Sequence, residues 1–219
     1  MALPIMELLL RDGGYNDADS GAACVPRASS SNVRPLVDIP DADVIDRIRA
    51  GDVRTFERLY EAYATPLFDF ARAYLHDAPL AEEVVATVLG NLWTRRANWT
   101  VRDRIEPYLF GAVHREILTM QRTTRRRAAL IAMADDETRS RSIGHAPVSP
   151  DTALEQAELE ARVWQAVDAL PVRYRVATVL RWRRDMSYDE IAQVLEVSSD
   201  SARQLVSRAV RMIRERLGV

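Results

Sequence analysis

Lysine is absent from this sequence, so all 30 basic residues are arginine. Cysteine occurs once, at Cys24, which excludes an internal disulfide and a cysteine-rich zinc site. The three histidines, His76, His114 and His145, lie far apart without the spacing of metal ligands, so we expect no metal and no cofactor. No apolar run approaches the ~20 residues of a membrane span. These absences predict a cytoplasmic protein that does not insert into a membrane.

The sequence also lacks the patterns of catalysis. It has no nucleophile–base pair, no glycine loop that could hold a phosphate and no metal-ligand spacing, so we expect neither an enzyme nor a small-molecule substrate. The net charge is only −2, but acidic and basic residues lie in different stretches. Arginine suits bidentate contacts with phosphates and bases. A GC-rich genome, whose codons favour arginine, is the simpler explanation for most of the arginine content.

The segment 187–217 predicts two helices joined by a very short turn. Ser187 followed by Glu190 is a capping box, which opens the first helix. Either Ser198 or Ser199 is a natural N-cap for the second. Because the turn at residues 196–198 cannot span much distance, the second helix must fold back across the first. The pattern is therefore that of a helix-turn-helix.

The second helix of this pair separates into two faces. At 100° per residue its polar residues fall within an arc of roughly 140°. These are Asp200, Arg203, Gln204, Ser207, Arg208 and Arg211. The opposite side is apolar and consists of Ala202, Leu205, Val206, Ala209, Met212, Ile213 and Leu217. Arginine, glutamine and serine can reach phosphates and base edges, so the polar arc favours DNA binding. The alternative is a solvated face on an ordinary helical hairpin.

The rest of the chain predicts helices in two groups, which makes an all-α fold of two small domains. In the first group, a short helix ends at Gly51 and a longer one covers residues 53–75, where Pro66 should kink or divide it. Asp77 caps the next helix. Asp103 with Glu106 forms a second capping box, which opens a helix from about residue 105 to residue 127.

A polar stretch at residues 134–150 has no apolar period and predicts a linker. Beyond it, Thr152 with Glu155 caps a helix that ends near residue 169, and Pro171 opens another over residues 172–182. The expected organisation is a mobile extension at 1–40, a helical domain at 41–130, a flexible linker at 131–151 and a helix-turn-helix domain at 152–219.

Several short motifs carry a resemblance to a known family. The strongest are Ala169-Leu170-Pro171, the run SYDEIA at 187–192, and Ser207-Arg208-Ala209. The first domain adds AEE at 81–83, Leu92-Trp93 and YLF at 108–110. In these positions the chain resembles the extracytoplasmic-function sigma factors, the two-domain promoter-recognition subunits of bacterial RNA polymerase. The resemblance covers residues 41–217 without the linker.

The resemblance implies that the first domain corresponds to sigma region 2 and binds core RNA polymerase and the minus-ten promoter element. The residues that would bind polymerase are Glu82, Glu83, Ala86, Thr87, Leu89 and Trp93. Those that would bind the melted minus-ten element are Arg95, Arg96, Asn98, Trp99, His114, Arg115, Arg122 and Arg125. Aromatic and arginine side chains suit single-stranded DNA.

The second domain would correspond to sigma region 4 and read the minus-thirty-five element as duplex. Its site would consist of Ser199, Asp200, Arg203, Gln204, Ser207, Arg208 and Arg211. The implied partners are core RNA polymerase, promoter DNA and a possible anti-sigma factor.

The chain departs from the family pattern at three places. Ala86, Thr87 and Leu89 stand where the family has glutamine, an acid and phenylalanine. His114-Arg115 and Thr119 replace an Arg-Asn pair and an aspartate, and Glu196 occupies a turn position that usually holds glycine. Two other readings stay open: a helix-turn-helix transcriptional regulator that acts without recruiting core polymerase, and a helical adaptor without a nucleic-acid role.

Overall fold

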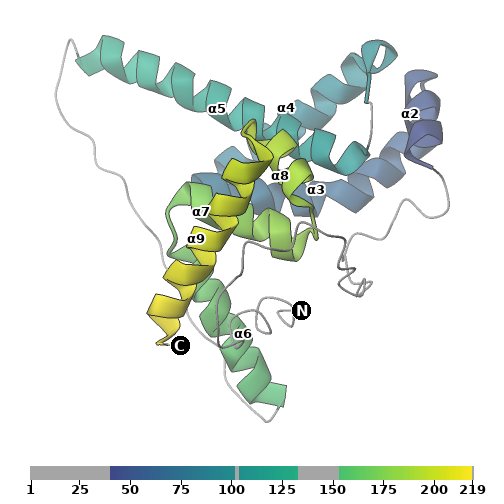
Figure 1. Cartoon of the computed structure of the whole chain (residues 1–219). Coiled ribbons are helices and arrows are strands. Elements are labelled where there is room, and N and C mark those ends of the chain that lie inside the picture. The colour runs from purple at the N-terminus through teal and green to yellow at the C-terminus, as the bar shows by residue number, and fades with distance from the viewer. Residues whose placement is uncertain (1–39, 102–103, 133–152, 219) are drawn as a thin grey trace. The chain divides into compact units, whose positions relative to one another are not determined.

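A computed structural model describes residues 40–101, 104–132 and 153–218, with side chains for all of them except 125–132 and 153–160 (Figure 1). Every regular element within these ranges is helical, which confirms the expected all-α fold. The chain divides into two compact units, with α2 to α5 in one and α6, α7, α9 and most of α8 in the other. The expected N-terminal extension and the polar linker at 134–150 lie outside the described residues.

The first unit contains α2 (Asp41–Arg49), α3 (Val53–Leu75), α4 (Ala78–Thr94), the short 3-10 helix η1 (Arg96–Asn98) and α5 (Ile105–Ala132). Its four α-helices share one apolar core, in which the Phe70 and Phe110 rings meet edge to face at 5.2 Å between centroids. The core includes Val44, Ile48, Leu59, Leu67, Phe70, Val84, Leu89, Leu109, Phe110 and Ile117.

The end of α2 lies where the sequence predicts it. Gly51 has a φ of +87°, a left-handed conformation that glycine adopts without steric cost. Its N–H donates to the carbonyl of Ile48 at 2.9 Å, and the N–H of Asp52 donates to that of Arg47 at 3.0 Å. These two bonds form a Schellman motif, which satisfies carbonyls at the helix end. The Asp52 carboxylate then caps α3 by accepting from the N–H of Arg54 at 3.0 Å.

Pro66 does not divide α3, which runs as one helix from Val53 to Leu75. The prediction of a division at this residue is therefore wrong. Proline removes one backbone hydrogen bond from the helix interior. Buried side chains flank it on both sides, with Tyr63 and Leu67 packed into the core of the unit. This tertiary packing keeps the helix continuous where local propensity would interrupt it.

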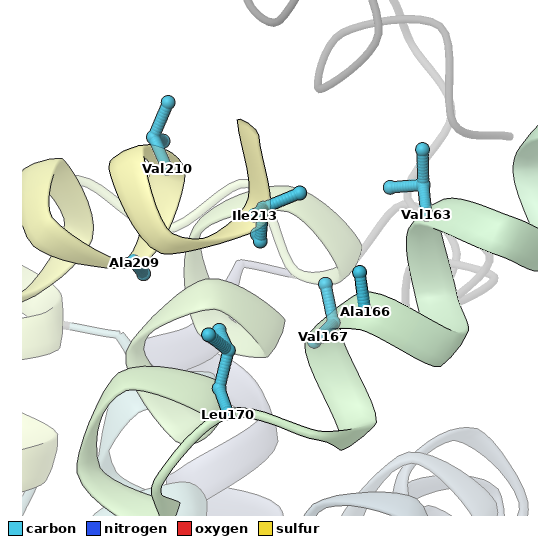
Figure 2. Close-up of a cluster of buried hydrophobic side chains, with 7 residues drawn as sticks. All are labelled: Val163, Ala166, Val167, Leu170, Ala209, Val210 and Ile213. Carbon is cyan, nitrogen blue, oxygen red and sulfur yellow. The ribbon is translucent and has the colours of Figure 1, made fainter. Parts of the chain in front are cut away.

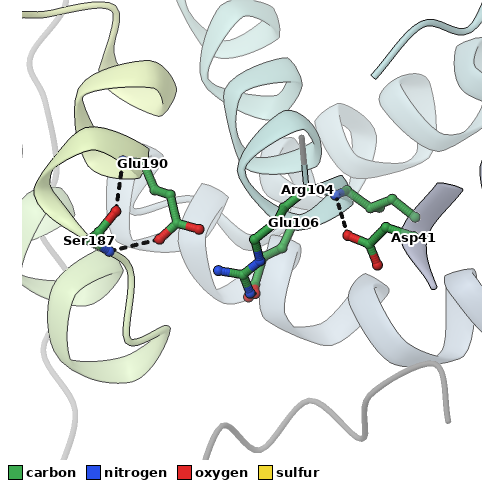
Figure 3. A network of polar contacts seen from close by, with 6 residues as sticks. Asp41, Arg104, Glu106, Ser187 and Glu190 are labelled. Carbon is green, nitrogen blue, oxygen red and sulfur yellow. Dashed lines mark hydrogen bonds and ion pairs between the residues drawn. The ribbon is translucent and has the colours of Figure 1, made fainter. Parts of the chain in front are cut away.

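The start of α5 is stabilised by a residue from α2. The N–H of Ile105 donates to Oδ2 of Asp41 at 2.8 Å, across 64 positions of sequence (Figure 3). Asp103, the first residue of the capping box expected here, lies outside the described residues. The buried Glu106 pairs with Arg104 at 3.2 Å. The first turn of α5 therefore depends on the docking of α2.

The second unit contains α6 (Ala153–Asp168), α7 (Val172–Thr178), the π-helical segment η2 (Val179–Arg183), α8 (Tyr188–Leu195) and α9 (Ser199–Leu217). The predicted helix at 172–182 is present, but its winding changes to π at Val179. Seven buried side chains join the end of α6 to the second half of α9 (Figure 2): Val163, Ala166, Val167, Leu170, Ala209, Val210 and Ile213. This cluster holds α9 in place from its apolar side. Thr152, the expected cap of α6, lies outside the described residues.

A buried arginine forms hydrogen bonds with the backbone between α6 and α7. Arg175 is 2% exposed, and its Nη1 donates to the carbonyls of Asp168 and Leu170. These carbonyls belong to the last residue of α6 and the loop behind it, where backbone acceptors lack helical partners. Burial lowers the pKa of Arg175 from its ordinary value, because desolvation disfavours the charged form. The guanidinium thus takes the place of missing backbone donors.

Candidate nucleic-acid interface

The candidate interface in the second unit begins with the capping box of α8. The N–H of Ser187 donates to Oε2 of Glu190 at 2.8 Å, and the N–H of Glu190 donates to Oγ of Ser187 at 3.2 Å (Figure 3). The reciprocal pair confirms the capping box predicted from the sequence. It sets the first residue of the helix-turn-helix.

The turn between α8 and α9 places Glu196 in the left-handed region, with a φ of +55°. The N–H of Val197 donates to the carbonyl of Ala192 at 3.1 Å. This is the bond of a Schellman motif that closes a turn of six residues. This geometry explains why glycine is the favoured residue at Glu196. Immediately afterwards Ser198 caps α9, since its Oγ accepts from the N–H of Ser201 at 3.2 Å. Of the two candidate caps, Ser198 is the one used.

α9 has the two faces that its sequence predicts. Its apolar stripe is buried at Ala202, Leu205, Val206, Ala209 and Ile213, while Met212 and Leu217 are partly buried at its margin. Five of the seven proposed minus-thirty-five residues are exposed: Asp200, Gln204, Ser207, Arg208 and Arg211. The other two, Ser199 and Arg203, are half-buried. The helix therefore presents amide, hydroxyl and guanidinium groups on one side while the other is anchored.

The Arg203 side chain contacts an aromatic ring, although its place on the helical wheel indicates an exposed side chain. Its guanidinium lies over the ring of Tyr188, 5.3 Å from the centroid. The guanidinium of Arg181 lies at the same distance from that ring. A cation over an aromatic face is attracted by the ring quadrupole, so Tyr188 orients Arg203. Tyr188 was not among the site residues predicted from the sequence, although it is an aromatic residue at the first position of an otherwise polar helix start.

Arg211 forms an exposed ion pair with Glu215 one turn later, at 3.9 Å. A solvent-exposed pair of this kind is worth little free energy and can open to admit another anion. Arg211 therefore stays available on the exposed face of α9.

The first unit carries the proposed polymerase site on α4. Glu82, Glu83, Ala86 and Thr87 are exposed and lie within two turns of the helix. Leu89 is 2% exposed and belongs to the core of the unit, so its side chain is not available to a partner. Assigning Leu89 to the polymerase surface is therefore corrected: its place on the helix points inward, toward the neighbouring helices.

Trp93, the last residue of the proposed polymerase site, is half-buried at the edge of α4. Its ring packs against Phe56 at 4.9 Å between centroids. The guanidinium of Arg96 covers it at 4.5 Å and donates to the carbonyl of Trp93 at 2.9 Å. These contacts give Trp93 and Arg96 fixed positions at the surface.

The proposed minus-ten residues divide into exposed and buried groups. Arg95, Asn98, Arg115 and Arg122 are exposed, while the side chain of Arg125 lies outside the described ones.

Trp99 is 4% exposed and packs against Tyr108 at 5.7 Å between centroids, and His114 is 6% exposed beside Tyr74 at 5.6 Å. A buried ring cannot stack on a base. Trp99 and His114 are therefore removed from the candidate DNA surface, since both side chains serve the packing of the unit.

The described ranges contain neither a cluster of metal ligands nor a helix that could span a membrane. No group of three or more histidine, cysteine, aspartate or glutamate side chains gathers there in a way that could hold a metal ion. None of the helices in those ranges combines the length and the apolar character that crossing a membrane requires.

Comparison with known proteins agrees with this geometry. Residues 59–127 match the family described as Sigma-70 region 2, and residues 160–213 match Sigma-70, region 4. The RNA polymerase sigma-H factor of Pseudomonas aeruginosa is 24% identical over 172 residues, which are 77% of this chain and 89% of that protein. The ECF RNA polymerase sigma factor SigW of Bacillus subtilis is 20% identical over 178 residues, or 79% of this chain and 94% of that protein.

Among solved structures, the sigma factor RpoE in complex with the anti-sigma factor NepR, from Bartonella quintana, is similar with a TM-score of 0.59. Its sequence is 20% identical, and the match covers 76% of this chain and 99% of that one. At this identity the likeness shows a shared fold.

Proposed function

The chain belongs to the sigma-70 family, as an extracytoplasmic-function sigma factor that directs promoter-specific transcription initiation with core RNA polymerase, and from this premise we propose which of its surfaces perform each step. The second unit reads the minus-thirty-five element as duplex DNA through the exposed face of α9. The first unit binds polymerase through α4 and holds the minus-ten element through exposed arginines. The observation that carries the first assignment is the division of α9 into an anchored apolar stripe and an exposed polar face.

Within α9, base contacts are assigned to its N-terminal half. In a helix-turn-helix the first turns of the second helix enter the major groove. Gln204 is exposed there, and an amide can pair with adenine through two hydrogen bonds. Arg203, oriented by Tyr188, is the second base-reading candidate, and Asp200 and Ser207 complete the face. Arg208 and Arg211 lie further along the helix and meet phosphates.

The polymerase surface consists of the four exposed residues Glu82, Glu83, Ala86 and Thr87, with Trp93 at its edge. The small side chains of Ala86 and Thr87 leave the middle of this surface open to close approach. The two glutamates make it acidic, which suits a basic partner surface. The replacement of a glutamine and an acid by Ala86 and Thr87 predicts that affinity for polymerase differs from that of typical members.

The minus-ten site consists of Arg95, Arg115 and Arg122 with Asn98, together with Arg96, which lies over Trp93. Guanidinium groups neutralise backbone phosphates and stack on unpaired bases, which are the two contacts that single-stranded DNA requires. Arg125 is included from the sequence alone.

Sigma factors act by binding, and the proposal assigns no catalytic step to this chain. Its site of action is then the cytoplasm, where polymerase and promoter DNA meet. The similar RpoE was solved with an anti-sigma factor, which supports a protein inhibitor of that class as a further partner of this chain.

Run-off transcription with core polymerase and genomic DNA fragments tests the function. Added to active core, the folded chain should direct initiation from a small set of promoters whose start sites can be mapped. Thr87→Arg places a charge on the α4 surface and should weaken core binding at least about tenfold. Thr65→Arg, at a threonine that is also exposed but lies on α3, is the matched control and should bind core normally.

Failure to form an open complex at any genomic promoter, with folded protein and active core, would contradict the proposal. Specific binding to promoter DNA without core, together with no effect of Thr87→Arg, would instead support the plain helix-turn-helix regulator.

A further inference from the structure

A small cavity lies between the beginning of α7 and the beginning of α9. Its volume is about 150 Å³, roughly ten times what one water molecule needs. Arg173 contributes from α7, and Ser201, Gln204 and Arg208 contribute from α9. Tyr174, Val197 and Leu205 complete the lining. All of these residues belong to the second unit.

The chemistry of this lining is one-sided. The polar residues that line the cavity are two arginines, a glutamine, a serine and a tyrosine, and no carboxylate lines it. Arg173 and Arg208 are both exposed, and within the described ranges neither guanidinium forms an ion pair or a hydrogen bond. Two like charges that share a cavity without a counter-charge repel each other. The arrangement becomes favourable when an anion with several acceptor oxygens lies between them.

The two arginines are also held by rigid elements. Val176 and Ala177 of α7 and Leu205 of α9 are buried, so the packing of α7 on α9 fixes the backbone at both sides of the cavity. A site built on packed helices can bind an anion without first ordering a loop, which reduces the entropic cost of binding.

We propose that this cavity holds one phosphate of the promoter DNA backbone, clamped between Arg173 and Arg208. Gln204 and Arg208 line the cavity and also lie on the exposed face of α9 assigned above to the minus-thirty-five element. When α9 lies in the major groove, a backbone strand runs along the groove edge beside it. The clamp then fixes how deep α9 sits and in which register Gln204 meets the bases. Phosphate contacts of this kind position a protein, while base contacts specify the sequence.

The inference rests on the proposed function, and it adds Arg173, which lies outside the helix-turn-helix and which the sequence analysis did not assign. The same cavity chemistry would suit a free phosphate. The test therefore separates a backbone phosphate from the free anion.

Holoenzyme formed from the full chain and core polymerase should be titrated with promoter duplexes that carry a neutral methylphosphonate at one backbone position at a time. One position near the minus-thirty-five element should weaken binding by the wild-type chain about tenfold. The Arg173→Ala/Arg208→Ala double variant should lose about the same factor on unmodified DNA and be insensitive to the methylphosphonate at that position.

The salt dependence of DNA binding gives a second test. Because both arginines hold one phosphate, the double variant should lower the slope of log K against log[salt] by about one unit rather than about two. Arg216→Ala, an exposed arginine near the end of α9 that does not line the cavity, is the matched control and should leave both measurements unchanged.

Failure of this inference is distinguishable from failure of the proposed function. One outcome would contradict the phosphate clamp alone. In it, the wild-type holoenzyme prefers its minus-thirty-five sequence, but the double variant behaves like wild type at every methylphosphonate position. The proposal that α9 recognises the minus-thirty-five element would then still stand. If no duplex is preferred but inorganic phosphate shifts the Nε–Hε resonances of Arg173 and Arg208 at submillimolar concentration, the cavity binds the free anion and the assignment to DNA is overturned.

Discussion

The start of α5 is stabilised over a much longer distance along the chain than the starts of α8 and α9. In the second unit, Ser187 and Ser198 each cap a helix through a residue three positions away. In the first unit, the N–H of Ile105 at the start of α5 finds its acceptor on Asp41, 64 positions earlier. The helix-turn-helix can therefore organise its ends from neighbouring residues, whereas the beginning of α5 is complete only after α2 has docked.

This difference has a consequence for the two functions. α9 needs a defined N-terminus because its first turns are the ones assigned to base reading. Its N-terminal cap joins residues only three positions apart and needs no partner from another helix. α5 carries the proposed minus-ten residues Arg115 and Arg122, and its start depends on the fit of Val44 and Ile48 of α2 into the core. The first unit thus couples the helix that carries the proposed minus-ten residues to the packing of α2.

The largest expected loss of stability comes from a substitution at the junction of α6 and α7. The contacts there join residues close in sequence, but they are buried. Arg175→Ala would leave the carbonyls of Asp168 and Leu170 without their donor and should destabilise the second unit by about 2–4 kcal/mol. Chemical denaturation followed by tryptophan fluorescence measures the change. Arg173→Ala, an exposed arginine on the same helix, should change stability by less than about 0.5 kcal/mol. Equal effects of the two substitutions would show that the carbonyl contacts of Arg175 contribute nothing.

The remote cap comes next. Asp41→Ala should cost the first unit about 1–2 kcal/mol, because the Ile105 N–H loses its acceptor in a partly buried place. The exchange rate of that amide should rise about 5- to 30-fold if local opening limits protection. Asp43→Ala removes an acid from the same first turn of α2 without touching α5, and it should leave the Ile105 amide protected. If both substitutions accelerate exchange equally, the effect belongs to the α2 terminus and not to the contact with α5.

Removing the local cap of α9 should cost less stability. Ser198→Ala removes the acceptor of the Ser201 N–H and should destabilise the second unit by about 1 kcal/mol. Asp at this position should restore stability, because its carboxylate accepts the same bond and also suits the positive end of the helix. The thermal unfolding temperatures of the wild type, Ser198→Ala and Ser198→Asp test this prediction. A Ser198→Asp variant no more stable than Ser198→Ala would rule out capping as the cause.

The smallest effect is a gain, and it compares the two Schellman motifs. Gly51 ends α2 and Glu196 ends α8, both with positive φ. Glu196→Gly removes the steric cost of a side chain in the left-handed region and should stabilise the protein by about 0.5–1 kcal/mol. Gly51→Ala should destabilise the first unit by about 1 kcal/mol for the opposite reason. Loss of stability in Glu196→Gly, measured by the same denaturation, would show that the interactions of the Glu196 side chain outweigh its steric cost.

Features that depend on a few neighbouring residues were predictable from the sequence. The capping box of Ser187 and Glu190, the end of α2 at Gly51 and the two faces of α9 all follow from residue type and spacing. The family motifs led to the sigma-factor assignment for the same reason, since they are short and contiguous. Pro66 shows the limit of such reasoning, because packing on both sides of it keeps α3 continuous.

The sequence by itself therefore determined the helical elements, the helix-turn-helix and the exposed face of α9, because the interactions that define them span three or four positions. Only the tertiary structure decided that Leu89, Trp99 and His114 are buried, that Asp41 caps α5, and that Arg173 and Arg208 share a cavity. Exposure and juxtaposition depend on which helices pack against a given face, and residues far apart in sequence carry no local signal of the contact that packing creates.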